Sequence, residues 1–276
     1  SSPQVFSVRI FRKRYKRVGE SMKSNLINKI KTNKRLKSNL ITFGMVVFAY
    51  ILMEILMAAG VVSSLLKGLL VPLCIYAILA VSLNLTVGIL GELSLGHAGF
   101  MCVGAFSGAF FSKCMQDAIP IAGVRFTLAL LIGALCAGLF GFLIGIPVLR
   151  LKGDYLAIVT LAFGEIIKNI INILYVGIDE NGFHFSTKSS LELNLSENGK
   201  IIIQGAQGIT GTPNDSTFTI GILLLLITLI IVLNLINSRD GRAIMAIRDN
   251  TIAAESVGIN ITKYKLMAFS ISAALA

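Results

Sequence analysis

Few residues in this chain have the types and spacing that covalent chemistry requires. Enzymes place a nucleophile beside a base, or cluster metal ligands or paired carboxylates, but the two histidines, His97 and His184, lie far apart in the sequence. A phosphate-binding GxxxxGK[ST] loop is also missing, because the nearest Gly-Lys pair, Gly199-Lys200, has Asn194 in place of the first glycine. We therefore expect no catalytic residue and no cofactor bound by this chain.

The four cysteines do not suggest a metal or redox site. They lie in or beside apolar runs, at Cys74, Cys102, Cys114 and Cys136. Neither a CxxC spacing nor a histidine pair accompanies them, so we interpret them as free thiols that pack like small apolar side chains.

Several polar residues are predicted to lie inside apolar segments, where they suit either a structural role or the lining of a polar path. Glu165 and Lys168 are three residues apart, so they can form an ion pair on one helical face. Alternatively, Glu165 faces such a path, and Lys168 extends toward the membrane surface. His97 either fixes a broken helix or faces the path, and Asn84 bonds across helices or contacts a solute. The candidate path residues are Asn84, Ser94, Gly96, His97 and Glu165.

The composition indicates whether water or lipid surrounds these residues. Of 276 residues, 55% are hydrophobic and 14% are charged, whereas soluble domains carry roughly 25% charged residues. The chain is therefore an integral membrane protein, and a soluble enzyme is excluded. The net charge of +11 does not indicate nucleic-acid binding, because 12 of the 25 lysines and arginines lie in residues 1–39, beside the single acid Glu20.

Apolar runs predict an all-α, polytopic transmembrane helical bundle over residues 40–276. The six predicted spans are 40–59, 69–90, 95–112, 126–149, 155–176 and 218–236. The third is rich in glycine and contains His97, which is typical of a broken or re-entrant helix that lines a cavity. A further apolar run begins at 266 and is cut at 276; as a helix it would rise only about 16 Å, half the hydrocarbon thickness. We therefore expect the natural chain to be longer.

Charge predicts the orientation. The basic tail at 9–37 is the expected cytoplasmic flank of the first span, and no signal-peptide core precedes residue 39. Six crossings then put the turn at 150–154 and the segment 237–265 in the cytoplasm, with the segment 177–217 outside. The predicted cytoplasmic segments hold 19 basic residues and the outer ones hold five.

The segment 238–258 reads as two short helices between two spans. Ile244 and Ile247 share a face of the first helix, and Gly258 is placed to end the second by adopting a left-handed conformation. Candidate N-caps for the second helix are Asp249, Asn250 and Thr251.

The second short helix suits a docking role. The small residues Ala253 and Ala254 beside Glu255 allow close approach of a partner and leave a carboxylate to accept hydrogen bonds. The alternative is an amphipathic segment that lies on the membrane surface.

Four parts of the chain, in the same order, resemble signatures of the branched-chain amino acid ABC transporter permeases. They are SLNLTVG with SLGHAGF at 82–100, GDYLAIVTLAFGE at 153–165, GITGTPN at 208–214 and RAIMAIRDNTIAAESVGINITKYK at 242–265. The last resembles the ATPase-coupling loop, and the GDYLAIVTL element resembles one subtype of the two paired permeases. The similarity extends over roughly 70–276.

Three features depart from the family pattern. Thr212 stands where a glycine is usual in the outer-loop motif, and the coupling loop lacks the I-x-LP ending of the broader importer consensus. The polar insertion at 178–203 is longer than the family needs; it is either a surface insertion or a contact for a binding protein.

The resemblance implies a permease subunit of an ABC importer for leucine, isoleucine or valine, in a bacterial-type inner membrane. The implied partners are a second permease, two ATP-binding cassette ATPase subunits that hold ATP and Mg²⁺, an extracytoplasmic solute-binding protein and the lipid bilayer. The implied ATPase-coupling residues are Arg242, Arg248, Asp249, Ala253, Ala254, Glu255 and Gly258.

Three other functions stay open at this point. A urea or short-amide permease would share the fold and the motifs. An ion-coupled secondary transporter would use Glu165 and His97 as a proton relay, without an ATPase. A membrane scaffold would bind RNA or lipid through its basic tail.

Overall fold

The computed structural model describes residues 39–116, 118–151, 153–179, 182–188, 190–193, 199–212 and 215–276. The chain divides into two compact units, Ser1–Val62 and Ser63–Ala276. In the first unit, one helix covers Asn39–Ala58 and is long and apolar enough to cross a membrane. The predicted basic tail at 9–37 lies outside the described residues.

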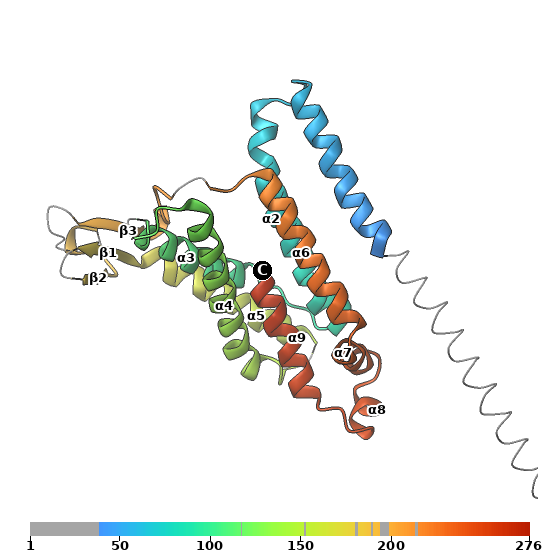
Figure 1. Cartoon of the computed structure of the whole chain (residues 1–276). Helices are drawn as coiled ribbons and strands as arrows, with labels where there is room; N and C mark the ends of the chain where they lie inside the picture. Colours follow the sequence, from blue (N-terminus) through green and yellow to red (C-terminus); the bar gives the residue numbers. More distant parts are fainter. Residues whose placement is uncertain are drawn as a thin grey trace, which may run out of the picture. The chain divides into compact units, whose positions relative to one another are not determined.

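The second unit is a bundle of helices with a small sheet at one end (Figure 1). Its helices are α2 (Ser64–Asn84), η1 (Leu85–Leu90), α3 (His97–Cys114), α4 (Ala122–Val148), α5 (Asp154–Ile173), α6 (Phe218–Asn237), α7 (Arg239–Asp249), α8 (Thr251–Ser256) and α9 (Ile261–Leu275). Among the described residues, five segments qualify as membrane spans by length and apolarity: Asn39–Ala58, Ser64–Leu90, Ala122–Val148, Asp154–Ile173 and Phe218–Asn237. The predicted polytopic helical bundle is confirmed.

The glycine-rich third run is interrupted at its start. α2 continues into a π-helix, η1, which ends at Gly91 with φ +80°, and irregular backbone leads from there to His97. α3 itself is one continuous helix of 18 residues, although it is not among the five candidate spans. The break that the sequence indicates therefore lies before α3.

Small residues set the distance between the packed helices. A Cβ on Gly133 of α4 would lie 2.7 Å from the carbonyl oxygen of Gly104 on α3, and a Cβ on Gly99 would lie 2.9 Å from the Cα of Gly164 on α5. Because lipid is as apolar as leucine, helices in a membrane associate through close van der Waals contact, which small residues permit. α3 is thereby held between α4 and α5.

Two apolar clusters organise the bundle. One joins Phe100, Ile144 and Phe269, where the rings of Phe100 and Phe269 meet edge to face with centroids 5.4 Å apart. The other joins Leu85 and Leu90 of η1 to residues of α6, α7 and α9. α9 contributes to both clusters, so the start of the last apolar run is already part of the bundle core.

The predicted outer segment contains a sheet that the sequence analysis did not predict. α5 ends at Ile173 rather than at 176, and Tyr175 begins a strand. The strands β1 (Tyr175–Asp179), β2 (Gly182–Ser186) and β3 (Lys200–Gln204) pair antiparallel in the order β2-β1-β3. Two 3₁₀ turns, η2 (Ser190–Leu193) and η3 (Gly205–Gln207), accompany them. The three consecutive isoleucines at 201–203, which favour a strand, lay inside a polar region.

Cations tie this outer segment to the helices. Lys113 at the end of α3 donates to the carbonyl oxygens of Ile201 at 2.8 Å and Thr210 at 2.7 Å. Arg125 in the first turn of α4 forms an ion pair with Asp215 at 3.0 Å. Part of the predicted insertion at 178–203 lies outside the described residues, but the described strands are joined to the bundle by specific contacts.

Candidate functional site

The segment 238–260 folds as the two predicted short helices because a polar side chain caps each start. Ser238 Oγ accepts a hydrogen bond from the backbone N–H of Gly241 at 3.0 Å, which starts α7. Asn250 Oδ1 accepts from the N–H of Ala253 at 3.0 Å, which starts α8. Asn260 Oδ1 accepts from the backbone N–H of Lys263 at 3.0 Å, which starts α9. Of the three candidate caps for α8, Asn250 is the one used.

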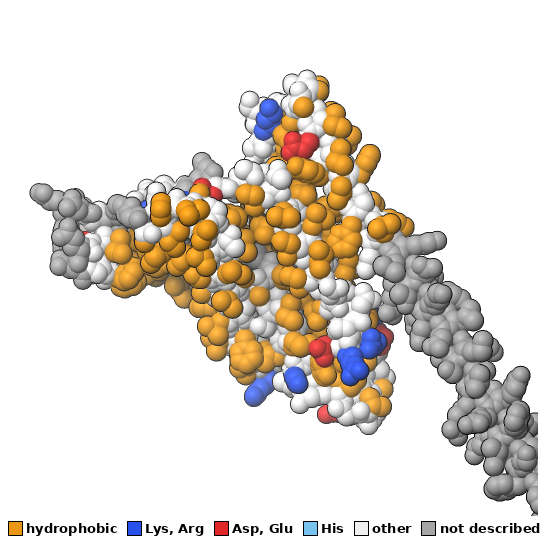
Figure 2. Space-filling model, viewed as in Figure 1, with side chains coloured by type: hydrophobic (Ala, Val, Ile, Leu, Met, Phe, Trp, Pro, Cys, Tyr) orange, Lys and Arg blue, Asp and Glu red, His pale blue; other side chains and the backbone are white. Residues whose placement is uncertain are grey.

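α7 turns its apolar face inward. Ile244 is 0% exposed and Ile247 is 2% exposed, so the predicted common face is buried, and Ile244 packs with residues of η1, α6 and α9. Charged side chains gather around α7 on the visible face of the molecule, while apolar side chains cover most of the helices above it (Figure 2). α7 is therefore a docked helix at the polar end of the bundle.

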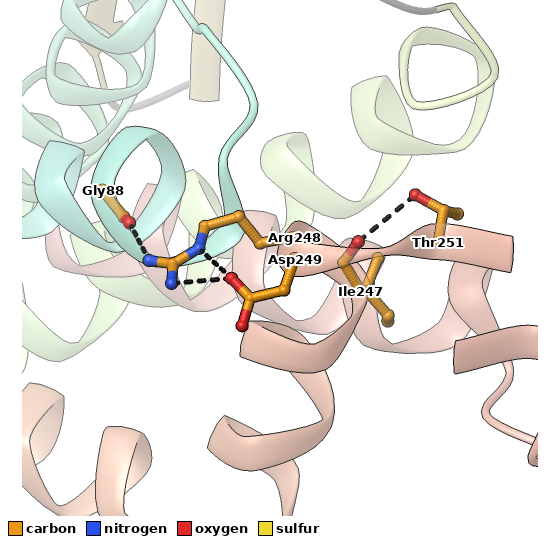
Figure 3. Close-up of polar contacts among 5 residues, drawn as sticks. All are labelled: Gly88, Ile247, Arg248, Asp249 and Thr251. Atoms are coloured by element: carbon orange, nitrogen blue, oxygen red, sulfur yellow. Dashed lines mark hydrogen bonds and ion pairs between the residues drawn. The ribbon is translucent and has the colours of Figure 1, made fainter. Parts of the chain in front are cut away.

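Arg248 attaches α7 to the end of η1. Its Nη1 donates to the carbonyl oxygen of Gly88 at 2.9 Å, while its Nε and Nη2 bond Asp249 Oδ1 at 3.1 and 2.9 Å (Figure 3). The carbonyls at a helix end lack intrahelical partners, so a guanidinium is a suitable donor there. A Cβ on Gly91 would lie 2.5 Å from Arg248 Cγ, so the left-handed Gly91 also makes room for this side chain.

A second ion pair joins the same turn to α9. Lys265 Nζ bonds Glu92 Oε1, and both side chains are largely buried. The turn after η1 is thus connected to α7 through Arg248 and to α9 through Lys265. Movement of α7 or α9 would be passed directly to this turn.

α8 presents apolar side chains to its surroundings. Ile252 in α8 is 81% exposed and Val257, the residue just after its last turn, is 75% exposed, so the described chain leaves most of their apolar surface uncovered. The helix ends at Gly258, whose φ is +84° as predicted. The N–H of Gly258 donates to the carbonyl oxygen of Glu255 at 2.9 Å, and the N–H of Ile259 donates to the carbonyl oxygen of Ala254 at 3.1 Å. This pair of bonds is the Schellman pattern.

The other candidate coupling residues are either exposed or buried against the chain. Arg242 is exposed and donates to the carbonyl oxygen of Asn237 at 3.1 Å. Ala253 and Glu255 are exposed on α8. Ala254 is 3% exposed, so its methyl group packs against the described chain and not on the exposed side of α8.

His97 lies in a buried hydrogen-bond cluster drawn from α2, η1, α3 and α9. Its Nε2 is 3.0 Å from Ser82 Oγ, and Thr86 donates to Ser272 Oγ at 2.8 Å. Ser272 Oγ donates to the carbonyl oxygen of Ser82. Ser82 Oγ uses its single proton to donate to the carbonyl oxygen of Leu79 at 2.8 Å. The histidine must therefore donate through Nε2, which fixes its tautomer.

Within the described residues, two buried polar atoms near this cluster have no hydrogen-bond partner. They are His97 Nδ1 and Ser94 Oγ. Gly96 allows the chain to cross α5 closely, because a Cβ there would lie 2.0 Å from the carbonyl oxygen of Thr160. Ser94, Gly96 and His97 thus occupy one buried helix crossing.

Asn84 and Glu165 do not join that crossing. Asn84 is exposed in the last turn of α2. Glu165 is exposed on α5 and pairs with Lys168, with Lys168 Nζ 3.2 Å from Glu165 Oε2. The predicted i,i+3 ion pair is present, but both side chains are more than half exposed. Within the part of the chain that the structure describes, the five candidate path residues therefore do not converge on one cavity.

Two hollows in the described part of the chain are apolar. One, of about 370 Å³, lies between α4 and α9 and is lined by residues such as Leu139 and Ile271. The other, of about 180 Å³, lies among α2, α4 and α6 beside Cys74. Neither includes a candidate path residue.

Sequence reasoning missed two sets of residues. Glu92 and Lys265 lie at the ends of two predicted spans on the same predicted side of the membrane, and their opposite charges were a usable signal. Ser82, Thr86 and Ser272 carried no such signal, because a serine or threonine within an apolar helix commonly bonds its own backbone. Only the packing of α9 on α2 identifies this cluster.

Comparisons with known proteins agree with these features. Residues 65–276 match the family described as the branched-chain amino acid transport system / permease component. The chain is 37% identical over 211 residues to the high-affinity branched-chain amino acid transport system permease protein LivM of Salmonella typhimurium (strain LT2), an alignment that covers 73% of this chain and 48% of that protein. It is 36% identical to LivM of Escherichia coli (strain K12), with the same coverage.

The chain thus spans about half the length of the curated relatives it matches. No solved structure matches significantly. The family match covers the whole bundle of the second unit, from α2 to α9, including the α7–α8 segment. The chain is a multi-pass membrane protein, and it belongs to the branched-chain amino acid transport system permease component family.

Proposed function

We propose that this chain is a transmembrane permease subunit of an ATP-binding cassette importer that takes up leucine, isoleucine and valine. The proposal rests on one observation above all: α8 exposes Ile252 and Val257 while α7 beside it is docked on the bundle. A short helix with exposed apolar side chains, held by a rigid neighbour, is suited to bind a partner and to transmit its movement.

The transmission follows from the contacts of α7. A partner that moves α8 pulls on α7, because Thr251 Oγ1 at the start of α8 donates to the carbonyl oxygen of Ile247 at 3.2 Å (Figure 3). α7 in turn moves the end of η1 through Arg248, and α9 moves it through Lys265. The Ser82–His97–Ser272 cluster joins η1 and α9 to α3. The movement thereby reaches the helices that enclose the broken segment at 91–96.

The partners and the orientation are part of the same proposal. α8 binds one of two ATP-binding cassette ATPase subunits, which hold ATP and Mg²⁺, and a second permease completes the pore. The N-terminus and the α7–α8 segment face the cytoplasm of a bacterial-type inner membrane. The sheet of β1, β2 and β3 faces outward, toward an extracytoplasmic solute-binding protein.

Affinity purification of the full-length protein from mildly solubilised native membranes, followed by mass spectrometry, tests the assembly. We expect an ATP-binding cassette subunit and a second permease to co-purify. A protein that is recovered alone in several mild detergents would contradict the proposal.

Uptake assays separate the competing functions. Excess leucine should inhibit uptake of labelled valine and excess urea should not, whereas the reverse result identifies a urea or amide permease. Uptake should fail when ATP is depleted and persist when the proton gradient is collapsed. An ion-coupled transporter gives the opposite pattern; the burial of His97 at 4% exposed, against the exposed Glu165, disfavours a relay between them.

A further inference from the structure

One exposed face of α5 carries four polar side chains at helical spacing. Glu165, Lys168, Asn169 and Asn172 are all exposed and follow one another at i, i+3, i+4 and i+7. They therefore form a single stripe along the C-terminal half of the helix. We call these four residues the polar stripe. The helix that bears it, Asp154–Ile173, is long and apolar enough to cross a membrane.

Lipid is an unsuitable neighbour for the polar stripe. Ionisable side chains within membrane-spanning helices face the bundle interior or water, because hydrocarbon leaves their charges unsolvated. Here two opposite charges and two amides lie on the same face. Either protein or water must therefore cover it in the assembled transporter.

Close protein packing is already provided by another face of α5. Gly164 meets Gly99 there, and Thr160 meets Gly96, through contacts that admit no extra Cβ. Helices in membranes pack tightly through such small residues. The long side chains of Glu165 and Lys168 hold a neighbouring backbone away. The stripe is thus suited to water rather than to helix packing.

We propose that the polar stripe lines a water-filled passage and binds the charged groups of an amino acid in transit. This inference rests on the proposed import of branched-chain amino acids. The Glu165 carboxylate accepts hydrogen bonds from the α-ammonium group, and the Lys168 ammonium donates to the α-carboxylate. Asn169 and Asn172 supply amide donors and acceptors beside them.

The geometry of the ion pair agrees with this role. Glu165 and Lys168 bond each other at 3.2 Å and are 55% and 61% exposed. An exposed pair of this kind is weak. The ammonium group of a zwitterion can therefore take the place of Lys168 beside Glu165, and its carboxylate can take the place of Glu165 beside Lys168. In the absence of solute, the pair satisfies itself.

The same line of α5 becomes apolar toward its N-terminus. Ile158 lies seven residues before Glu165 and is 61% exposed, and Leu161 lies four residues before it and is 47% exposed. A solute whose charged groups lie at Glu165 and Lys168 can place a branched aliphatic side chain against these two residues. The stripe therefore has the order of groups that leucine or valine requires.

Cysteine accessibility in the full transporter tests the passage. In a full-length protein whose native cysteines are replaced by alanine, Asn169→Cys is compared with the matched control Ile170→Cys, because Ile170 is next in sequence, is 54% exposed and lies on the apolar side of the same helix. We expect a membrane-impermeant thiol reagent to label Asn169→Cys about tenfold faster or more, since thiolates form only in water. Excess leucine should slow this labelling severalfold, and excess urea should not.

Two results overturn the inference. Equal labelling of the two cysteines means that protein covers the stripe, and fast labelling that leucine does not slow means that the passage holds no substrate there. The labelling ratio can be measured whether or not the wild-type protein transports leucine. Failure of the proposed function therefore appears separately, as the absence of leucine uptake.

A kinetic test addresses the two charged residues. Glu165→Gln and Lys168→Met should each raise the KM for leucine about tenfold, which is the order expected when one charged hydrogen bond is lost. The control Ile170→Leu should leave the KM unchanged. An unchanged KM in both charge variants, with normal protein levels, would contradict their contact with substrate.

Discussion

α7 and α8 are consecutive short helices with similar capping and opposite relations to the rest of the chain. α7 buries Ile244 and Ile247 to 0% and 2% exposure, whereas α8 leaves Ile252 at 81% and Val257 at 75%. Both helices contain isoleucine, a residue type that folded proteins usually bury. The difference shows that residue type alone does not separate an anchor from a contact surface; the neighbours in space do.

The contrast extends to the polar residues of the two helices. Arg248 at the end of α7 bonds the carbonyl oxygen of Gly88 and fixes α7 to η1. Glu255 of α8 is exposed. We interpret α7 as the element that holds the segment in place and α8 as the element that binds the partner. Substitutions that distinguish the two helices test this interpretation.

The largest expected effect is on α7. Ile247→Asp places a charge in a buried apolar contact, which we expect to destabilise the fold by about 3 kcal/mol or more. The yield of monodisperse protein in detergent and its unfolding temperature measure the loss. If this variant keeps wild-type yield and unfolding temperature, α7 is not docked as described.

The matched substitution on α8 is expected to separate stability from function. Ile252→Asp should leave yield and unfolding temperature unchanged, because the side chain is already exposed. Uptake of leucine should fall about tenfold or more, as is typical when a central apolar interface residue is lost. Normal uptake by this variant would exclude Ile252 from the contact.

A smaller effect is expected when the connection between α7 and η1 is removed. Arg248→Ala deletes the hydrogen bond to Gly88 and the ion pair with Asp249, and we expect about 1–2 kcal/mol of destabilisation. ATP hydrolysis by the assembled transporter should become less dependent on solute, because α8 then moves without moving η1. Measuring ATPase activity with and without leucine checks this, and an unchanged ratio would contradict the role of Arg248.

A comparable but more local effect is expected at the end of α8. Gly258 adopts φ +84°, so Gly258→Val should cost about 1–2 kcal/mol and distort the Schellman turn, whereas Gly258→Asn should cost only a few tenths. Leucine uptake should fall in the valine variant and be largely retained in the asparagine variant. Equal uptake by the two variants would show that the left-handed turn does not matter for coupling.

The smallest effect is expected at Arg242. Its side chain is exposed and, among the described residues, bonds the carbonyl oxygen of Asn237 just before α7, so Arg242→Ala should change stability by no more than about 0.5 kcal/mol. Uptake then reports whether Arg242 contacts a partner. A stability loss as large as that of Arg248→Ala would erase the distinction between the two arginines.

Local sequence signals predicted the helices and their ends well. Apolar runs located the five candidate spans within a few residues but also predicted a span at 95–112, where α3 does not qualify. Asn250 and Gly258 were among the predicted cap and stop of α8. These features depend on nearest neighbours, since caps and left-handed turns act over three or four residues. The ion pair between Glu165 and Lys168 belongs to the same class, because its spacing lies within one helix.

Features that depend on tertiary packing were not predictable. The hydrogen bonds of His97 require α9 to lie against α2, and the burial of Ala254 requires α8 to lie with one face on the chain. The sheet of β1 to β3 lay within a segment whose overall polarity masked its short strands. For His97 and Ala254 the missing information was the position of another segment of the chain, whereas for the sheet it was a local strand signal that the polar residues around it masked.

The most direct test of the central claim is photo-crosslinking in native membranes. A photoreactive amino acid is placed at Ile252 on α8 or, as the control, at Phe185 on β2, which is 69% exposed on the predicted opposite side of the membrane. Our account predicts that Ile252 crosslinks to an ATP-binding cassette ATPase subunit and that Phe185 does not. A crosslink to that subunit from Phe185, or none from Ile252, would contradict it.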